Sequence, residues 1–532
     1  MGTPCLGALE LFLRSFSVMA TTQSLNSDDA RLAELGYKQE FKRHFTLWET
    51  FGLSFSEVSV VPGIASVFFI SLSNGGPVSM IWGWLISGFF ITLVCIAVSG
   101  TRICRSYRRW IVLLDSSVCL STMPKSPLVD YSNTIYLMAG VASLAWSIAL
   151  QIAACISIES NFTWAPTTAQ LFGISAAVLV AQALVACFAT RIMARLQSFV
   201  IAVNFALILV VIIALPAATP KEFKNNATYA LGKFDNINGW SNGFAFVLSF
   251  LTPLWVIGGF DVTAHISEEA SNANFAVPWA NIMATSLAIT TGLAVNVAVA
   301  FCMGNDLLSI LSDPTGQPFA TASCSRAFIF LTISYMRNLY SFIALALFLS
   351  EANLTLAASR QTFAFARDGA LPLSFWIYRM NKFSATPINA VWVVTSVAFI
   401  FTFLVFAGPT AITTVFSLTI VAQYLSYIIP IFCRFAFKND FTPGPFHTGR
   451  LSAPISILSL VWMVFMMVIF MFPAIPKVSP VSMNYTSACL GGWVLFVSCR
   501  GPIPNIETER DFTSGAALMD ESGDSSTLEK KA

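Results

Sequence analysis

Long apolar runs separated by short polar stretches make up most of the chain. A helix needs about 20 apolar residues to cross a hydrocarbon core of about 30 Å. About twelve runs reach or approach that length, and the last is the shortest: 47–72, 78–100, 132–158, 168–189, 195–216, 241–262, 277–303, 338–358, 388–407, 411–435, 453–473 and 482–499. Because lipid tolerates no irregular backbone, the pattern predicts an all-α polytopic membrane protein with about twelve transmembrane helices.

The composition supports this class and excludes others. Hydrophobic residues are 56% of the chain and charged residues 11%, whereas a soluble domain carries about 25% charged residues. The 11 cysteines are scattered without a C-x-x-C pair, and the 3 histidines lack the spacing of metal ligands. No phosphate-binding loop, nucleophile elbow or zinc-protease motif occurs. We therefore predict that the chain is not an enzyme and needs no metal or cofactor.

The stretch 254–269 has features that an ordinary membrane helix lacks. It reads LWVIGGFDVTAHISEE. The paired glycines Gly258 and Gly259 allow a helix to open its backbone, and Asp261 follows at once. An acid inside a membrane helix costs at least about 2.5–3.5 kcal/mol, so it is rarely there without a function. We predict a broken helix whose break holds a substrate; the alternative is a flexible helix end with Asp261 in the headgroup layer.

The first apolar run contains a matching irregularity at residues 60–66, VVPGIAS. Pro62 removes a helical hydrogen bond and Gly63 loosens the turn. A simple kink is one interpretation. However, interrupted helices at corresponding positions of two halves indicate the midplane site of a secondary transporter. Together with the break in the sixth run, this favours a two-sided substrate site.

The distribution of Lys and Arg predicts the orientation. The predicted inner loops carry Arg102, Arg105, Arg108, Arg109, Lys125, Arg191, Arg195, Arg360, Arg367, Arg379, Lys382, Lys438 and Arg450, and the outer loops carry fewer. This positive-inside pattern places residues 1–45 and 501–532 in the cytosol as tails of a transmembrane domain over 46–500. Three glycosylation sequons fall in predicted outer loops, at Asn161, Asn226 and Asn484, and a fourth, at Asn353, lies inside a helix.

Several stretches are similar to a known family: LGYKQEFKRHFTLWETFGLSFSEVSVVPGIAS (35–66), NGGPVSMIWGW (74–84), PLWVIGGFDVTAHISEEASNA (253–273), AASRQTFAFARDGALP (357–372) and GPIPN (501–505). On these motifs the chain resembles the fungal branch of the amino acid–polyamine–organocation permeases, which includes GABA, amino-acid and choline permeases. The resemblance implies a LeuT-like fold of two inverted five-helix repeats plus two helices. It also implies uptake by alternating access, driven by an ion gradient that is usually of protons.

Two places depart from the family pattern. Residues 99–114 are basic and bulky where the family has small, flexible residues, and the last helix is short. A misassigned exon edge or reading frame would account for both, and the transcript across these codons tests it. A genuine departure at 99–114 would alter the inner gate.

An amino-acid substrate has two poles, and the predicted breaks offer groups for both. Amide N–H groups at a helix N-terminus suit its carboxylate, and the candidates are Gly63, Ile64, Ala65 and Ser66. Freed carbonyls and an acid suit its ammonium group, and the candidates are Val256, Ile257, Gly258 and Asp261. Phe260 is a candidate lid; by resemblance, it stands where the family places a gating aromatic.

Other charged residues are candidates for coupling and gating. Glu57 lies one turn before the first break, as a cation-binding or coupling acid or as a buried structural one. Glu351 lies in the eighth helix, which by resemblance lines the ion-coupling region. Arg360, Arg367 and Asp368 lie in a predicted cytosolic loop, 359–372, and are candidates for gate ion pairs. His265 is interpreted as an interfacial histidine, with a histidine that titrates near neutral pH as the alternative. Glu268 and Glu269 are interpreted as cytosolic surface acids that meet the loop arginines.

The leading interpretation is a permease that imports an amino acid or a related small amine such as GABA, with a proton gradient as driving force. The alternatives are a choline or polyamine permease, which would depend more on acids and aromatic rings, and a nutrient sensor that binds without transport. The expected partners are the small-molecule substrate and the lipid bilayer, and no nucleic acid. The expected location is the plasma membrane, with the vacuole or another endomembrane as the alternative.

Overall fold

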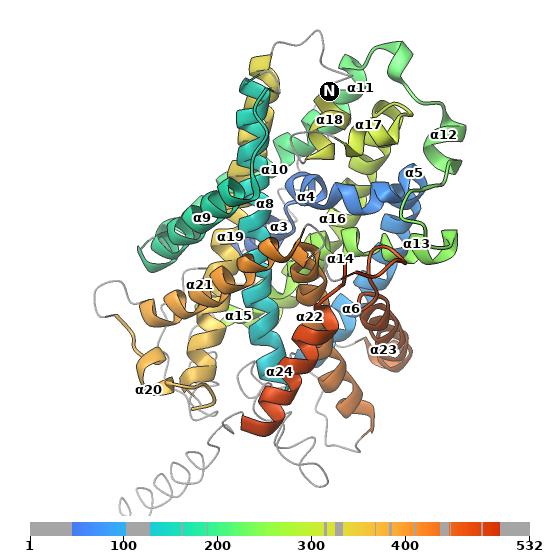
Figure 1. The fold of residues 1–532 in the computed structure, drawn as a ribbon. Coiled ribbons are helices and arrows are strands. Elements are labelled where there is room, and N and C mark those ends of the chain that lie inside the picture. Colours follow the sequence, from blue (N-terminus) through green and yellow to red (C-terminus); the bar gives the residue numbers. More distant parts are fainter. Residues whose placement is uncertain are drawn as a thin grey trace, which may run out of the picture.

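The computed structural model describes residues 45–102, 128–160, 163–188, 190–312, 317–324, 333–367, 369–381, 386–408, 411–436, 446, 448–479 and 482–500. Within these ranges eleven helical spans are long and apolar enough to cross a membrane: Leu47–Ser73, Gly76–Gly100, Leu128–Glu159, Thr168–Phe188, Ile192–Ala218, Asn242–His265, Ala273–Cys302, Arg337–Arg367, Ile388–Ala407, Ala411–Ala436 and Gly449–Ile469. A shorter apolar helical stretch, Thr486–Leu495, follows them. The all-α polytopic prediction is confirmed, and Figure 1 shows the helices gathered into one bundle.

The longer helices have the following bounds: α3 (Leu47–Val58), α4 (Val60–Ser73), α6 (Trp84–Arg102), α8 (Leu128–Glu159), α9 (Thr168–Phe188), α10 (Thr190–Leu209), α16 (Ala273–Cys302), α19 (Ile333–Arg367), α21 (Ile388–Thr402), α22 (Ala411–Ala436), α23 (Ser452–Ile469) and α24 (Thr486–Arg500). Short elements complete or connect them: α5 (Gly76–Val78), η1 (Ser79–Gly83), η3 (Val210–Ala214), α11 (Leu215–Ala218), η4 (Lys221–Phe223), α12 (Ala227–Gly232), α13 (Asn242–Leu248), α14 (Leu251–Ile257), η5 (Gly258–Asp261), α15 (Val262–His265), η6 (Ser267–Glu269), α17 (Leu307–Leu311), α18 (Pro318–Cys324), α20 (Ser374–Ile377), η7 (Phe403–Ala407) and η8 (Gly449–Leu451). Strands β1 (Asn74–Gly75) and β2 (Asp235–Asn236) form one antiparallel pair.

The first span is two helices joined at Ser59. Ser59 has φ 39° and ψ 63°, a left-handed conformation that ends α3 and starts α4. Its side chain donates to Asn204 Oδ1 of α10 over 3.0 Å, which holds the residue in place. Pro62 lies in the first turn of α4, where proline is tolerated. The break therefore comes one residue before the predicted stretch, residues 60–66, and a second irregularity follows that stretch at Val67, with φ −118° and ψ 15°.

The sixth span breaks where the glycine pair predicts. The α14 helix ends at Ile257, Gly258–Asp261 form a 3-10 turn, and α15 continues from Val262. The side chain of Asp261 is 0% exposed, so this acid is enclosed by protein. The broken spans are thus the first and the sixth, the first members of the two five-helix repeats that the resemblance implies.

The two breaks pack against each other through their glycines. A Cβ atom on Gly63 would lie 2.8 Å from Val256 Cγ1, and one on Gly259 would lie 2.3 Å from Glu57 Cγ. Each broken span therefore supplies a glycine that admits a side chain of the other. Figure 1 shows α3, α4 and α14 near the middle of the bundle, where α3 contacts η5 and α4 contacts α14.

The end of the bundle at which span one begins and span six ends is called the inner end below, because the Lys and Arg pattern predicts that it faces the cytosol. Here α19 continues to Arg367, so residues 359–367 are helix and the predicted loop over 359–372 is wrong for that part. The stretch is rich in Ala, Arg and Gln, which favour helix, and most of it is buried. The departing segment at 99–114 lies outside the described residues from 103 onward.

The sequons differ in their surroundings. Asn161 lies outside the described residues. Asn226 is exposed, and its Oδ1 accepts the Tyr229 N–H at the start of α12. The Nδ2 of Asn484 donates to the carbonyls of Phe470 and Phe472, at 2.8 and 2.9 Å, so this amide serves the local fold.

Candidate functional site

A small cavity lies where the two breaks meet. Its volume is about 30 Å³, which is room for a water molecule and less than a small-molecule pocket offers. Its walls come from α3, α4, α8, α14, η5, α19 and α22: Glu57, Val58, Gly63, Tyr136, Gly140, Ser143, Leu144, Trp255, Val256, Gly258, Gly259, Leu347, Leu354, Thr419, Ile420 and Gln423. Glu57 is the one carboxyl group among these lining residues, which include no Lys, Arg or His.

Some predicted site residues meet at this cavity. Gly63, Val256 and Gly258, from the predicted substrate-binding set, line it, and Glu57 lines it from the predicted coupling set. The structure thus brings together backbone of both breaks and one acid. Because the break lies at Ser59, the amide groups at the start of α4 differ from those predicted. The first N–H groups of α4 belong to Val60 and Val61, and the Gly63 N–H already donates to the Ser59 carbonyl over 2.7 Å.

Other predicted site residues lie away from the cavity wall. Ile64, Ala65 and Ser66 are buried inside α4, and Ser66 Oγ donates to the carbonyl of Pro62 in its own helix. Ile257 and Phe260 are buried as well, and neither lines the cavity.

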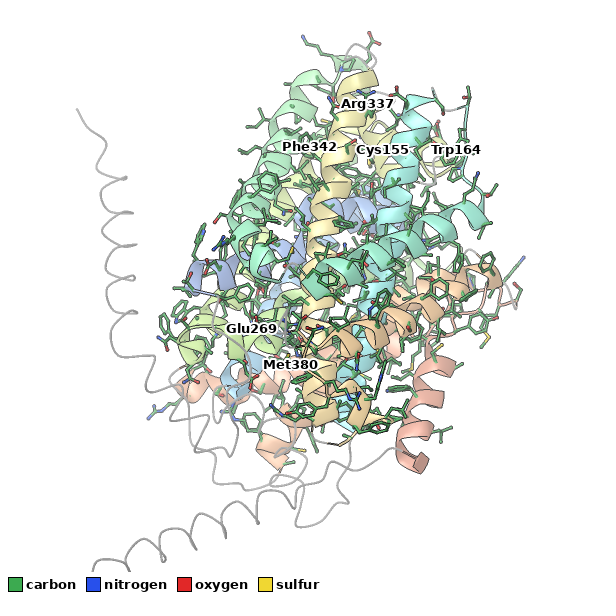
Figure 2. The ribbon with its side chains drawn as sticks, turned by 90° about the vertical axis from the view of Figure 1, so that its left-hand side faces the viewer. Cys155, Trp164, Glu269, Arg337, Phe342 and Met380 are labelled. Carbon is green, nitrogen blue, oxygen red and sulfur yellow. The ribbon has the colours of Figure 1, made fainter. Side chains whose placement is uncertain are left out.

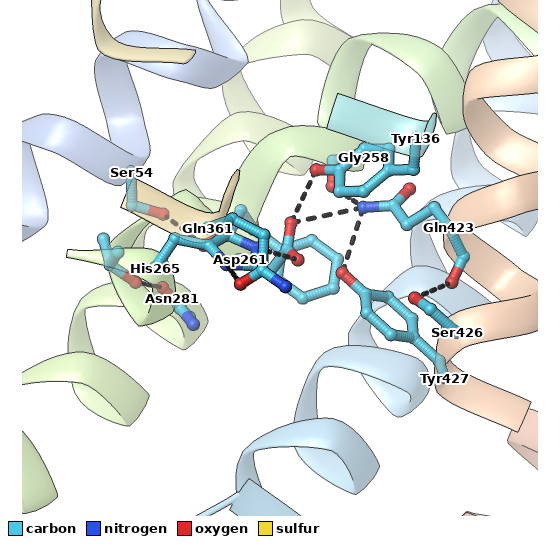
Figure 3. Close-up of polar contacts among 12 residues, drawn as sticks. Ser54, Tyr136, Gly258, Asp261, His265, Asn281, Gln361, Gln423, Ser426 and Tyr427 are labelled. Atoms are coloured by element: carbon cyan, nitrogen blue, oxygen red, sulfur yellow. Dashed lines mark hydrogen bonds and ion pairs between the residues drawn. The ribbon is translucent and has the colours of Figure 1, made fainter. Parts of the chain in front are cut away.

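Asp261 is enclosed by polar groups from three other helices (Figure 3). Its Oδ1 accepts the Tyr136 hydroxyl of α8 over 2.7 Å and the Gln423 amide of α22 over 3.3 Å. The same Gln423 Nε2 lies 2.6 Å from the Gly258 carbonyl and 3.0 Å from Tyr427 Oη. Tyr136 and Gln423 line the cavity, whereas Asp261 does not. Asp261 therefore stands behind the wall and contacts the site through these two side chains.

His265 faces the other oxygen of Asp261. Its Nε2 lies 3.4 Å from Asp261 Oδ2, and both side chains are 0% exposed. Its Nδ1 lies 3.2 Å from Gln361 Oε1 of α19. His265 is therefore part of a buried polar chain that runs from the cavity wall toward the inner end.

The two remaining acids lie on opposite sides of Ser350. Ser350 Oγ donates to the carbonyl of Glu57 over 3.1 Å and lies 3.5 Å from its carboxylate. Glu351 is fully buried in α19 and interacts electrostatically with Glu57. The side chain of Glu57 lies flat on Gly259. One acid thus reaches the cavity, and the second lies behind it.

Sequence reasoning missed Tyr136, Gln423 and Ser59. Tyr136 and Gln423 are isolated polar side chains within apolar runs, and that signal could have selected them as candidates. Ser59 has no such signal, because its unusual backbone conformation is visible only in the structure.

A buried ion pair lies at the inner end. Arg360 Nε and Glu269 Oε1 are 2.8 Å apart, with the side chains only 4% and 3% exposed. Figure 2 shows Glu269 in the lower part of the bundle, away from Arg337 at the opposite end. The prediction that Glu269 meets a loop arginine at the surface is wrong in its location: the pair is buried, and Arg360 is helical. Arg367 ends α19, and Asp368 lies outside the described residues.

The chain just before α3 also closes this end. The Phe45 N–H donates to the Glu269 carbonyl over 3.0 Å, and the Ser271 N–H donates to the Phe45 carbonyl over 2.9 Å. Phe45 and Ala270 therefore form a parallel bridge between the entry of span one and the exit of span six. Together with the ion pair, this joins spans one, six and eight.

We expect Arg360→Met to lower the free energy of unfolding by about 3–5 kcal/mol, because it leaves Glu269 as a buried, unpaired charge. Thermal stability in detergent measures the effect. Arg337→Met is the matched control: Arg337 and Glu159 are 2.9 Å apart but 41% and 57% exposed, so its loss costs about 0–1 kcal/mol. Equal destabilisation by the two variants would contradict the assignment.

Two broken helices that both line one small cavity are typical of a secondary transporter. The family model described as amino acid permease matches residues 45–496. The chain belongs to this family; it is a multi-pass membrane transporter and not an enzyme.

Curated relatives cover nearly the whole chain. An uncharacterized amino-acid permease of Schizosaccharomyces pombe is 32% identical over 532 residues, covering 96% of this chain and 94% of the relative. The GABA-specific permease of Saccharomyces cerevisiae is 32% identical over 482 residues, covering 88% of this chain and 83% of the relative. Amino-acid permease 2 of Neurospora crassa is 32% identical over 476 residues, with 87% and 85% covered.

Proposed function

We propose that the chain imports an amino acid or a related small amine such as GABA by alternating access, with protons as the driving ion. One observation carries the proposal: backbone from both breaks and a single acid, Glu57, surround one small cavity. Relatives named for GABA and for amino acids support this substrate class.

Glu57 is the group for the ammonium pole of the substrate. It is the acid of the cavity wall, and a hydrogen bond to a charged group contributes about 1.5–3 kcal/mol. The carboxylate pole is assigned to the start of α4, which carries the positive end of the helix dipole and lines the cavity at Gly63. Ser59 orients this helix start through its bond to Asn204.

Choline is the second candidate substrate, because the same cavity wall carries an acid and aromatic rings. Choline has no carboxylate and would depend on an acid and on aromatic rings, and Glu57, Trp255 and Tyr136 line the same cavity. A substrate panel therefore includes choline and polyamines beside GABA and amino acids.

Protons suit the buried acids near the breaks. Glu57, Asp261 and Glu351 are each at most 8% exposed, and a carboxyl group that gains and loses a proton avoids a permanent charge in the membrane. We keep Glu57 and Glu351 as coupling candidates on this basis. Arg360 and Glu269 are assigned to the inner gate, which is closed in this arrangement, and opening of that gate releases substrate to the cytosol.

Uptake assays in a host that lacks its own permeases test this function. Labelled amino acids, GABA, choline and polyamines are supplied at two external pH values, and uptake of the true substrate should rise at the lower pH. A fluorescent fusion distinguishes the plasma membrane, which we propose, from the vacuole. Binding without uptake would indicate a sensor, and no uptake of any compound by protein at the surface would reject transport.

We expect Glu57→Gln to raise the KM for the substrate by about 10- to 100-fold, because the substrate ammonium loses a charged partner. Initial rates over a range of substrate concentrations measure this. Ser143→Ala is the control at the same wall: Ser143 already bonds Gly140 and Trp255, so its KM should change far less. An unchanged KM in Glu57→Gln would remove this residue from ammonium binding.

A further inference from the structure

We propose that Asp261 and His265 together hold the coupled proton and that His265 releases it toward the inner end. The inference rests on the proposed proton coupling and assigns a place to the proton. Two features of the pair support this proposal: the polarity of its hydrogen bonds and its position between the cavity and the inner gate.

We assign the hydrogen atoms of this chain by hydrogen-bond polarity. Because Gln361 Oε1 is an acceptor, we assign His265 the tautomer with hydrogen on Nδ1, which lies 3.2 Å from this oxygen. A neutral imidazole with hydrogen on Nδ1 has a lone pair on Nε2. Nε2 faces Asp261 Oδ2 at 3.4 Å, and a carboxylate oxygen is also an acceptor. Attraction between these atoms therefore requires one proton between them, on the carboxyl group or on the imidazole.

The other oxygen of Asp261 is hydrogen-bonded to side chains of the cavity wall. Oδ1 accepts from Tyr136 and Gln423, both of which line the cavity (Figure 3). A substrate that draws either donor away removes a hydrogen bond that stabilises the Asp261 carboxylate, so the proton stays on Asp261 while the substrate is bound. When the donors return to Oδ1, the proton leaves the Asp261 carboxyl oxygen and bonds to His265 Nε2, which leaves a carboxylate and an imidazolium with the proton count unchanged.

His265 lies on the path to the gate. It precedes Glu269 by one turn, and its partner Gln361 is adjacent to Arg360, the partner of Glu269. When the gate opens, the imidazolium gives its proton to inner water and returns to the neutral form. Glu57 of α3 and Tyr136 of α8 act electrostatically on Asp261, and Tyr427 of α22 contacts its partner Gln423. Arg360 and Glu269 lie further toward the inner end, and α16 presents Asn281, which does not titrate, to Thr263.

His265→Gln in proteoliposomes tests the assignment. Net uptake driven by an inside-alkaline gradient requires proton release, whereas exchange of external labelled for internal unlabelled substrate returns the carrier with its proton bound. We expect net uptake to fall by about 100-fold, with exchange close to that of wild type. Thr263→Val is the matched control on the same short helix: it removes the 2.5 Å bond to Asn281 and should leave the ratio of net uptake to exchange unchanged.

The outcomes are distinct. Equal effects of His265→Gln on net uptake and exchange, or none on either, would overturn the proposal while wild-type coupling stands. Wild-type uptake that ignores the pH gradient would instead defeat the proposed function, and this inference with it. If His265→Gln fails to fold, Gln361→Leu keeps the histidine, removes its Nδ1 partner and should show the same loss of net uptake relative to exchange.

Discussion

Asp261→Asn is expected to abolish concentrative uptake while the protein still reaches the membrane. The amide has the shape of the carboxylate, so its oxygen can accept from Tyr136 and Gln423 while its NH₂ donates to His265 Nε2. The contacts survive, but an amide neither binds nor releases the proton. We expect the rate of net uptake to fall by about 100-fold or more.

Surface labelling together with initial uptake rates measures this effect. Thr263→Val is again the control, because it perturbs a buried polar bond two residues away. Normal concentrative uptake by Asp261→Asn would remove this residue from the mechanism. If Asp261→Asn is absent from the membrane, Tyr136→Phe replaces it; this variant deletes one of the two donors to Oδ1 and should slow uptake.

Gly259→Ala is expected to disable the site through packing. The added Cβ would lie 2.3 Å from Glu57 Cγ, so the acid must leave its position on the cavity wall. Overpacking of this kind costs typically about 1–3 kcal/mol, and displacement of the ammonium partner should raise the KM as strongly as Glu57→Gln. Gly258→Ala is the neighbouring control, since the Cβ atom added there would lie 3.3 Å from its nearest neighbour, the Gln423 side-chain oxygen.

A double variant separates this mechanism from general damage. Glu57→Ala removes the Cγ atom that the new methyl group would meet, so Gly259→Ala should add little to the loss already caused by Glu57→Ala. Residues in direct contact show such non-additivity, whereas independent sites add. Fully additive losses in KM and in thermal stability would contradict the contact between these two residues.

Much of the fold could be predicted because apolar length and local backbone rules determine it. The membrane spans follow from runs of apolar residues. The break in the sixth span is predictable because the two adjacent glycines that allow it, Gly258 and Gly259, are visible in the local sequence. The first break could not be placed. A serine at positive φ is locally unfavourable, and Ser59 adopts it with support from Asn204, 145 residues away. Local rules therefore selected Pro62 and Gly63 instead.

The candidate site was only partly predictable for the same reason. Gly63, Val256, Gly258 and Glu57 were selected from local irregularity, and these line the cavity. Asp261 was selected because an intramembrane acid is costly, which says that it has a partner but not which one. Its partners Tyr136 and Gln423 are 125 and 162 residues distant in sequence, so only the packing of helices reveals them.

Proton-driven import through the cavity between the two breaks is the central claim, and purified protein in liposomes tests it most directly. The lumen is made alkaline and loaded with a pH-sensitive dye, and the labelled substrate from the uptake panel is added outside. The account predicts accumulation of substrate together with acidification of the lumen, both lost when a protonophore collapses the gradient. Accumulation that persists without the gradient, or substrate entry without proton entry, would contradict it.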